Sequence, residues 1–221
     1  MVYITGSNGF VGKAISEYLE EDGLRVNRLN RKMEPEFLEG QNSFNNTVVH
    51  CAWAGVLGKS RNDHNVQTSN IEICKALAQF AVEKNASQVI AFGSQAEYGI
   101  CDQITTEKTP LKPITVYGKT KTLCHDIMNK ILAPHKIPLI WLRLYDPYGP
   151  GDNPQWFMPY IIQSALLDIS PKLTECTQIW DYIYIKDIVR LVKQLIKQPL
   201  DNSDVFNLSS GSPICLRNVV D

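Results

Sequence analysis

The stretch Thr5-Gly6-Ser7-Asn8-Gly9-Phe10-Val11-Gly12 decides the fold of this chain. Directly before it, the apolar run Val2–Ile4 has the β-favouring side chains of a buried strand. Directly after it, residues 13–21 carry apolar side chains at helical spacing. The glycines therefore lie at a turn between a strand and a helix.

Such a turn suits the phosphates of a dinucleotide. Gly6 allows the tight turn, Gly9 lets the backbone approach a pyrophosphate, and Gly12 lets the helix pack close to the sheet. The helix N-terminus adds free N–H groups and a partial positive charge. The spacing is G-x-x-G-x-x-G instead of G-x-G-x-x-G, and a glycine-rich turn without a ligand is the alternative. The residues expected to contact the cofactor are Gly6, Asn8, Gly9, Phe10, Val11 and Gly12.

The composition is that of an ordinary globular protein. The chain has 221 residues, of which 44% are hydrophobic and 20% charged, and its net charge is -1. That length suffices for one large domain, or for one domain with a small lobe. Because the charge is balanced and no apolar run reaches the roughly 18 residues of a membrane span, we expect neither a nucleic acid nor a membrane as partner.

The cysteines indicate a reducing compartment, and the histidines give no sign of a metal site. The six cysteines include no C-x-x-C pair, and the four histidines show no metal-ligand spacing. We therefore expect free thiols, no metal and, because the first strand leaves no room for a signal peptide, a cytoplasmic protein.

Strands and helices alternate through the first 150 residues. We predict strands at 25–29, 47–51, 88–93 and 138–144, and helices at 65–85 and 117–133. Alternation of this kind means βαβ units and a doubly wound parallel α/β sheet of the Rossmann type. Ligands bind such sheets at the carboxyl ends of the strands.

The pattern changes after about residue 150, where prolines become frequent. We predict a dinucleotide-binding domain at 1–150 and a partial substrate lobe at 151–221, interleaved with the end of the first domain. Within the second part we expect helices at 159–167 and 186–197 and strands at 181–185 and 205–208. Residues 216–221 read as the start of a helix, so the lobe is expected to be truncated.

Tyr117 and Lys121 lie four residues apart in a helical pattern, on one helix face. An ammonium beside a phenol favours the phenolate, so such a pair can exchange a proton with a carbonyl or an alcohol. A chance Y-x-x-x-K match in a structural helix is the alternative. Ser94 ends an apolar strand, where it either hydrogen-bonds a substrate oxygen or caps the strand end.

A glycine turn, a serine after the fourth strand and Tyr-x-x-x-Lys on the next helix occur here in that order. The chain resembles the short-chain dehydrogenase/reductase superfamily, and more closely its extended branch, which acts on nucleotide sugars. The likeness covers nearly the whole chain. The segments that carry it are His50–Ala54, Asn65-Val66, Gly93–Gly99, Leu142–Gly151 and Asp181–Asp187.

The resemblance implies roles for these residues. Ser94 would polarise a sugar carbonyl, Tyr117 would be the acid/base, and Lys121 would also hold the nicotinamide ribose. It further implies a nucleotide-sugar substrate, and a homodimer through the helices that begin near Asn65 and Tyr117. The further residues expected at the cofactor are Ala52, Leu144 and Tyr145.

The end of the second strand bears on the choice of cofactor. An acidic residue near Asn30 would hold a ribose 2′-hydroxyl, but the segment carries Arg28, Arg31 and Lys32. Cations suit a 2′-phosphate, so we favour NADP held by Arg31, with NAD and an exposed basic turn as alternatives.

Two positions depart from the pattern of the extended branch. Trp180 stands where an arginine often holds the substrate phosphates, and Asp146 replaces an asparagine or serine. Gln95-Ala96 after Ser94 also lacks the Asp-Glu pair of dehydratases. The segments Gly93–Gly99 and Tyr148–Asp152 resemble those of the 4-ketoreductases of 6-deoxyhexose biosynthesis. That resemblance implies NADP-dependent reduction of a nucleotide-linked 4-keto-6-deoxysugar. The alternatives are an epimerase with tightly bound NAD and an inactive, cofactor-binding regulatory or assembly subunit.

Overall fold

The computed structural model describes residues 1–34 and 46–220. Its centre is a six-stranded sheet in the order β2-β1-β3-β4-β5-β9, with every neighbouring pair parallel. The predicted doubly wound parallel sheet is confirmed. The strands are β1 (Val2–Thr5), β2 (Val26–Leu29), β3 (Thr47–His50), β4 (Gln88–Ser94), β5 (Leu139–Leu144) and β9 (Asp204–Leu208).

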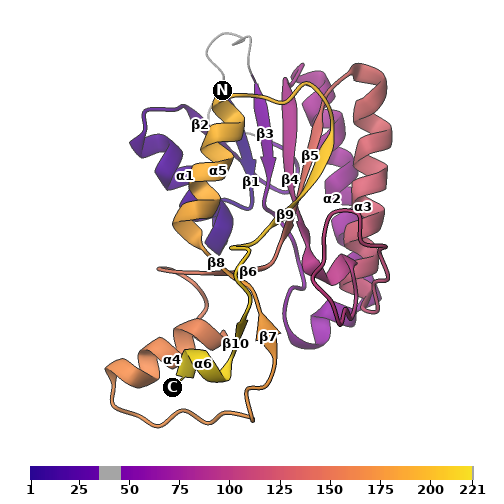
Figure 1. The fold of residues 1–221 in the computed structure, drawn as a ribbon. Coiled ribbons are helices and arrows are strands. Elements are labelled where there is room, and N and C mark those ends of the chain that lie inside the picture. The colour runs from indigo at the N-terminus through magenta and orange to yellow at the C-terminus, as the bar shows by residue number, and fades with distance from the viewer. Residues whose placement is uncertain (35–45, 221) are drawn as a thin grey trace.

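Helices cover both faces of this sheet, as Figure 1 shows. The helices α1 (Phe10–Glu21) and α5 (Ile185–Lys197) pack on one face, and α2 (His64–Glu83) and α3 (Val116–Leu132) on the other. Each pair closes its own hydrophobic core against the strands. The apolar residues of α5 recur at helical spacing, which is why one stripe of that helix is buried.

The helix α3 shows how the sequence pattern positions the chemistry. Cys124, Met128 and Leu132 are fully buried against the sheet and fix which face of the helix looks inward. Lys121 and Tyr117 lie on that same face, about one and two turns earlier respectively, at the end of α3 nearest the carboxyl ends of the strands. The core packing of α3 therefore turns both polar side chains toward the sheet edge.

The order in which strands are added to the sheet reverses between β1 and β3, because β2 lies on one side of β1 and β3 on the other. Parallel strands end at the same edge, and here Thr5 pairs in register with His50. The Oγ1 atom of Thr5 lies 2.8 Å from Nδ1 of His50, both side chains being buried. Such a switch point leaves a crevice beyond the strand ends, where doubly wound sheets bind their ligands.

A smaller part of the chain lies beyond that edge, at the bottom of Figure 1. Asp181 ties it to the loop after β9: its carboxylate accepts hydrogen bonds from the main-chain N–H groups of Ser210 and Gly211. The part contains β6 (Asp146–Tyr148), α4 (Phe157–Leu166), β7 (Ile179–Trp180), β8 (Tyr182–Tyr184), β10 (Ile214–Cys215) and α6 (Arg217–Val220). Residues 185–208 return to the larger part, where α5 packs on one face of the sheet and β9 forms its last strand.

Several element boundaries differ from the predicted ones. The helix α1 begins at Phe10 instead of residue 13, because Gly9 is its N-cap and Gly12 lies inside its first turn. The strand predicted at 181–185 is shorter, since α5 already begins at Ile185. Two 3₁₀ turns lie in segments to which we assigned no element: η1 (Gly58–Asn62) and η2 (Gln95–Glu97). A third, η3 (Ala133–His135), lies at the end of the helix predicted at 117–133.

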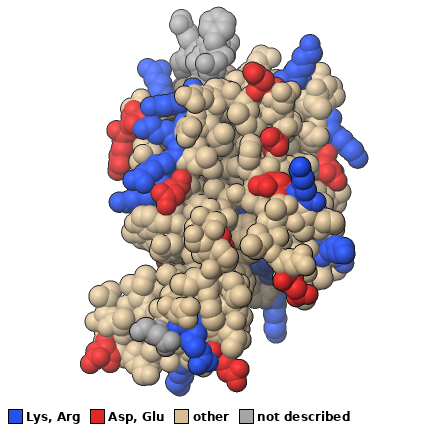
Figure 2. All heavy atoms as spheres, viewed as in Figure 1, with Lys and Arg blue, Asp and Glu red and all other residues tan. Residues whose placement is uncertain are grey.

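The surface carries charges of both signs, as the face in Figure 2 shows. Among the described residues, no helix is long and apolar enough to cross a membrane. The six cysteines are free thiols. Within 1–34 and 46–220, no group of three or more His, Cys, Asp or Glu side chains is arranged to hold a metal ion.

Candidate functional site

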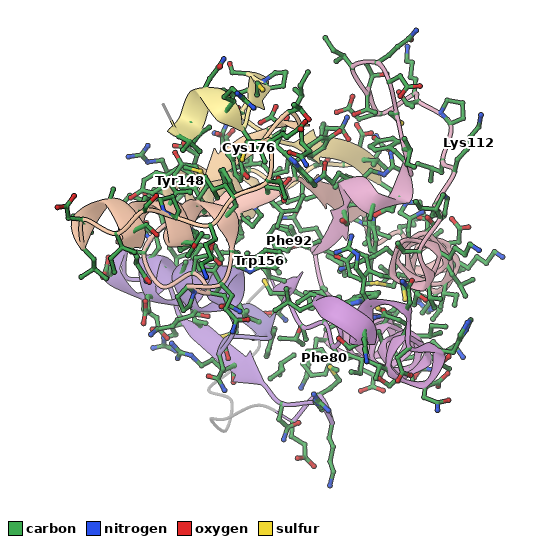
Figure 3. The ribbon with its side chains drawn as sticks, turned by 90° about the horizontal axis from the view of Figure 1, so that it is seen from below. Phe80, Phe92, Lys112, Tyr148, Trp156 and Cys176 are labelled. Carbon is green, nitrogen blue, oxygen red and sulfur yellow. The ribbon has the colours of Figure 1, made fainter. Side chains whose placement is uncertain are left out.

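A cavity of about 550 Å³ lies between the carboxyl edge of the sheet and the smaller part of the chain. Phe92 lines it from the sheet side, and Tyr148 and Trp156 line it from the other side; Figure 3 labels all three, seen from below. The sheet-side residues also include Gly9, Phe10, Val11, Gly12, Cys51, Trp53, Ser94, Tyr117, Lys121, Leu144 and Tyr145. Asp146, on β6, lines the cavity from the smaller part.

The first turn of α1 forms one end of the cavity. No side chain caps this helix, because its N-cap is Gly9. Its first N–H groups therefore have no side-chain partner and suit an anion. Gly6 sits just beneath: with φ +71°, a Cβ there would lie 2.5 Å from the backbone N of Ala52. The turn thus has the close-packed floor and open N–H groups that a pyrophosphate requires.

The Tyr117 ring lies deep in the cavity, with 7% of the residue exposed. The indole of Trp53 meets it edge-on, with ring centroids 5.8 Å apart. The guanidinium carbon of Arg61 lies 4.4 Å from the centre of the same ring. Two side chains thus hold the phenol in place while it lines the cavity.

Lys121 is the most enclosed charged group at the site. Its ammonium donates a hydrogen bond to the carbonyl oxygen of Phe92 at 2.6 Å. It also lies 3.7 Å from the centre of the Trp53 ring and 5.7 Å from the centre of the Tyr117 ring. Lys121 is only 4% exposed, so these partners leave little of it to solvent.

Ser94 both caps a turn and lines the cavity, so the two readings of this serine are compatible. Its hydroxyl oxygen accepts a hydrogen bond from the backbone N–H of Ala96 at 3.2 Å. In return, the Glu97 carboxylate accepts one from the Ser94 N–H at 2.8 Å, which completes a capping box over η2. The serine is therefore held at the strand end with its hydroxyl at the cavity.

A buried polar network supports Ser94 from behind. Glu97 is fully buried and forms an ion pair with Arg143 at 2.9 Å. Arg143 in turn donates to the Tyr98 hydroxyl, which donates to the side-chain oxygen of Asn207 on β9. A buried charge is costly unless it is paired, and each charge here has its partner. The network joins η2, β5 and β9 into one rigid support.

Asp146 places a carboxyl group in the cavity. Gln95 donates a hydrogen bond of 2.6 Å to it. Burial raises the pKa of Asp146 to about 6, against the opposing effects of that hydrogen bond and of Arg61. The group therefore titrates at about pH 6, at the wall of the cavity.

Changing Asp146 to asparagine is expected to stabilise the protein above neutral pH. The folded protein binds this proton more tightly than the unfolded chain, so the carboxyl costs stability as pH rises through about 6. We expect Asp146→Asn to gain about 1–2 kcal/mol at pH about 8 and little at pH about 4. Thermal melts across this range measure it, with the exposed carboxyl variant Asp201→Asn as control. A gain that does not change with pH would contradict the assignment.

The structure brings most of the predicted site residues together. Ser94, Tyr117 and Lys121 line the cavity, as do Gly9, Phe10, Val11, Gly12, Leu144 and Tyr145. Gly6 and Ala52 form the floor below, and Asn8 is exposed beside the turn. We did not predict Trp53 and Arg61 as site residues. Trp53 contacts Tyr117 from the loop after β3, and Arg61 contacts it from η1. The sequence signal for Trp53 is its place within the His50–Ala54 segment, and no spacing in the sequence signals Arg61.

Arg31 lies outside the cavity, on the exposed turn after β2. The basic cluster predicted there is smaller than expected, because the two terminal guanidinium nitrogens of Arg28 donate to the Glu20 carboxylate. The same turn brings an acid close: Asn30 donates to the Glu34 carboxylate at 2.8 Å. Sequence reasoning missed Glu34 because the turn, and not the strand, positions it.

Fold and cavity together define an enzyme built on a dinucleotide-binding sheet, with polar groups gathered where α1 begins. Residues 2–209 match the NAD dependent epimerase/dehydratase family, and the chain belongs to that family. It is therefore an NAD(P)-dependent enzyme of the extended short-chain dehydrogenase/reductase type, as the resemblance in the sequence implied.

Two curated relatives are similar over nearly all of this chain. The dTDP-4-dehydro-6-deoxyglucose reductase of Escherichia coli is 24% identical over 100% of this chain and 79% of the relative. The CDP-abequose synthase of Salmonella typhimurium (strain LT2) is 22% identical over 98% of this chain and 77% of the relative.

Solved structures of the same fold are also similar. A structure of MoeE5 in complex with UDP-glucose and NAD has a TM-score of 0.84 and 24% identity, covering 99% of this chain and 79% of that one. The UDP-N-acetylglucosamine 4-epimerase from Bacillus cereus has a TM-score of 0.84 and 22% identity, covering 99% of this chain and 78% of that one. At these identities, the likeness shows the fold.

Proposed function

We propose that this enzyme reduces the 4-keto group of a nucleotide-linked 6-deoxysugar, with NADP as its cofactor. One observation carries the proposal: Ser94, Tyr117 and Lys121 line the same cavity as the uncapped first turn of α1. Phosphates bound at that turn and a carbonyl near Tyr117 would share one continuous space. The reductase and synthase among the relatives support this substrate class.

Each residue has a distinct part in this proposal. Tyr117 gives a proton to the carbonyl oxygen as it becomes an alcohol. Lys121 provides a positive charge on the same helix face, which favours loss of that proton. The Ser94 hydroxyl donates a hydrogen bond to the same oxygen and orients the ketone. The bound cofactor would supply the hydride, and the residues at the start of α1 would hold its pyrophosphate.

The rest of the predicted assignment belongs to this proposal. Residues 1–150 would bind the cofactor, and residues 151–221 would bind the sugar part of the substrate. The sequence Gln95-Ala96 after Ser94 favours reduction over dehydration, because no Asp-Glu pair follows the hydroxyl. A homodimer formed through α2 and α3 and a cytoplasmic location remain predictions.

The cofactor preference can be tested at Arg31. An arginine binds a 2′-phosphate through paired hydrogen bonds, and NAD lacks that group. We expect Arg31→Ala to weaken NADP binding about tenfold, which is the effect of about 1.4 kcal/mol, and to leave NAD binding unchanged. Titration calorimetry measures both. Arg25→Ala, at the opposite end of β2, is the matched control. Tighter binding of NAD than of NADP by the wild type would instead favour Glu34 as a ribose contact.

The reaction itself is tested in two steps. Thermal-shift screening with NADP, NAD and UDP-, CDP-, GDP- and dTDP-sugars ranks the ligands, because stabilisation scales with concentration over Kd. The best nucleotide is then offered as its 4-keto-6-deoxysugar with NADPH. We expect NADPH to be consumed in proportion to sugar. Bound NAD that survives purification, without net NADPH consumption, would favour the epimerase, and cofactor binding without turnover would favour the inactive subunit.

A further inference from the structure

Trp53 lies against the two side chains that the proposed chemistry needs. Its indole face lies 3.7 Å from the Lys121 ammonium, and its edge meets the Tyr117 ring. On the other side, the ammonium donates to the carbonyl oxygen of Phe92 at 2.6 Å. With 4% of Lys121 exposed, the ammonium is enclosed between a carbonyl oxygen and an aromatic face.

The indole is held firmly in this position. Its Nε1–H donates to the side-chain oxygen of Gln67 at 3.1 Å. Gln67 is 1% exposed, and its amide nitrogen donates to the carbonyl oxygens of Gly55 and Ser60 at 2.8 and 3.0 Å. These bonds fix the loop after β3 to α2. The contact between Trp53 and Lys121 is therefore built into the fold and is not a chance approach of two mobile side chains.

We propose that Trp53 covers Lys121 in the cofactor-free protein and that a bound dinucleotide must displace the indole to reach the ammonium. This inference rests on the proposed function, in which the Lys121 ammonium faces the nicotinamide ribose. Hydroxyl groups and the indole then compete for one ammonium. The apparent cofactor affinity is reduced by the fraction of molecules in which the ammonium is uncovered. Trp53 is thus a positioning residue that sets cofactor affinity.

Cofactor affinity tests the inference directly. We expect Trp53→Ala to lower the Kd for NADP about tenfold, and Trp53→Phe to lower it by less, because phenylalanine offers a weaker face to a cation. Tyr18→Phe, which changes an aromatic residue of α1 outside this cavity, should keep the Kd within about twofold. Thermal melts establish that each variant is folded. An unchanged or weaker affinity in Trp53→Ala would overturn the proposal.

A second measurement needs no cofactor. Acylation by acetic anhydride, followed by mass spectrometry, reports how accessible the Lys121 amine is. We expect slow modification of Lys121 in the wild type and at least about fivefold faster modification in Trp53→Ala, with Lys119 on the outer face of α3 as internal reference. Equal acylation rates of Lys121 in the wild type and in Trp53→Ala would show that the indole does not shield the ammonium. If the wild type binds neither NADP nor NAD, the proposed function fails, while the labelling rates still decide whether Trp53 covers the ammonium.

Discussion

Replacing Tyr117 by phenylalanine is expected to lower turnover at least about a hundredfold, in line with the contribution of one acid/base group. Phenylalanine keeps the ring, so the contacts with Trp53 and Arg61 remain. Cofactor and substrate binding should therefore change little, and the loss should appear in kcat and not in KM. Steady-state rates with NADPH and the identified keto-sugar measure the effect.

The matched control removes a tyrosine hydroxyl from a helix that packs on the sheet, outside the cavity. Tyr18 lies on α1 against the side of α5, away from the cavity. We expect Tyr18→Phe to keep wild-type turnover. If Tyr117→Phe also keeps full activity, Tyr117 takes no part in the chemistry, and the proton must come from another group at the cavity.

Replacing Gly6 by alanine is expected to destabilise the protein by about 3 kcal/mol or more. The new Cβ would lie 2.5 Å from N and 2.7 Å from Cα of Ala52, which directly follows β3, and backbone atoms held there cannot move aside cheaply. The positive φ of +71° adds its own strain. For a chain of this size, we expect Tm to fall by roughly 6–12 °C.

Gly23→Ala separates the two causes. Gly23 has φ +78°, but a Cβ there would have no neighbour within 4 Å. Only the backbone strain applies, so we expect a loss of about 1 kcal/mol. Equal losses at the two positions would show that the close contact between Gly6 and Ala52 is not a constraint on the turn. Where Gly6→Ala still folds, its NADP affinity should fall while that of Gly23→Ala is kept.

The sheet and its helices could be predicted because their signals are local. The periodic burial of α3 and α5 follows from residues three and four apart, and the glycine turn follows from eight consecutive residues. Helix boundaries were less accurate, since α1 begins at Phe10 through an N-cap that has no side-chain signal. Local periodicity does not determine at which residue a helix begins or ends.

The candidate site was only partly predictable. Ser94, Tyr117 and Lys121 follow from strand ends and helix faces, which parallel topology brings to one edge. Arg61 and Asp146 come to that edge from a 3₁₀ turn and from the strand leading into the smaller part of the chain, so no spacing in the sequence links them. The pairing of Arg28 with Glu20 likewise removed one cation from the cluster that the sequence suggested.

By itself, the sequence determined the parallel sheet, the glycine-rich turn and the shared helix face of Tyr117 and Lys121, because each is a matter of short-range spacing. The tertiary structure decided what these groups touch. Trp53 and Lys121 are far apart in the chain, yet the indole lies on the ammonium because Gln67 on α2 holds it there. Contacts of this kind depend on how whole elements pack, and a linear pattern of residues does not record that packing.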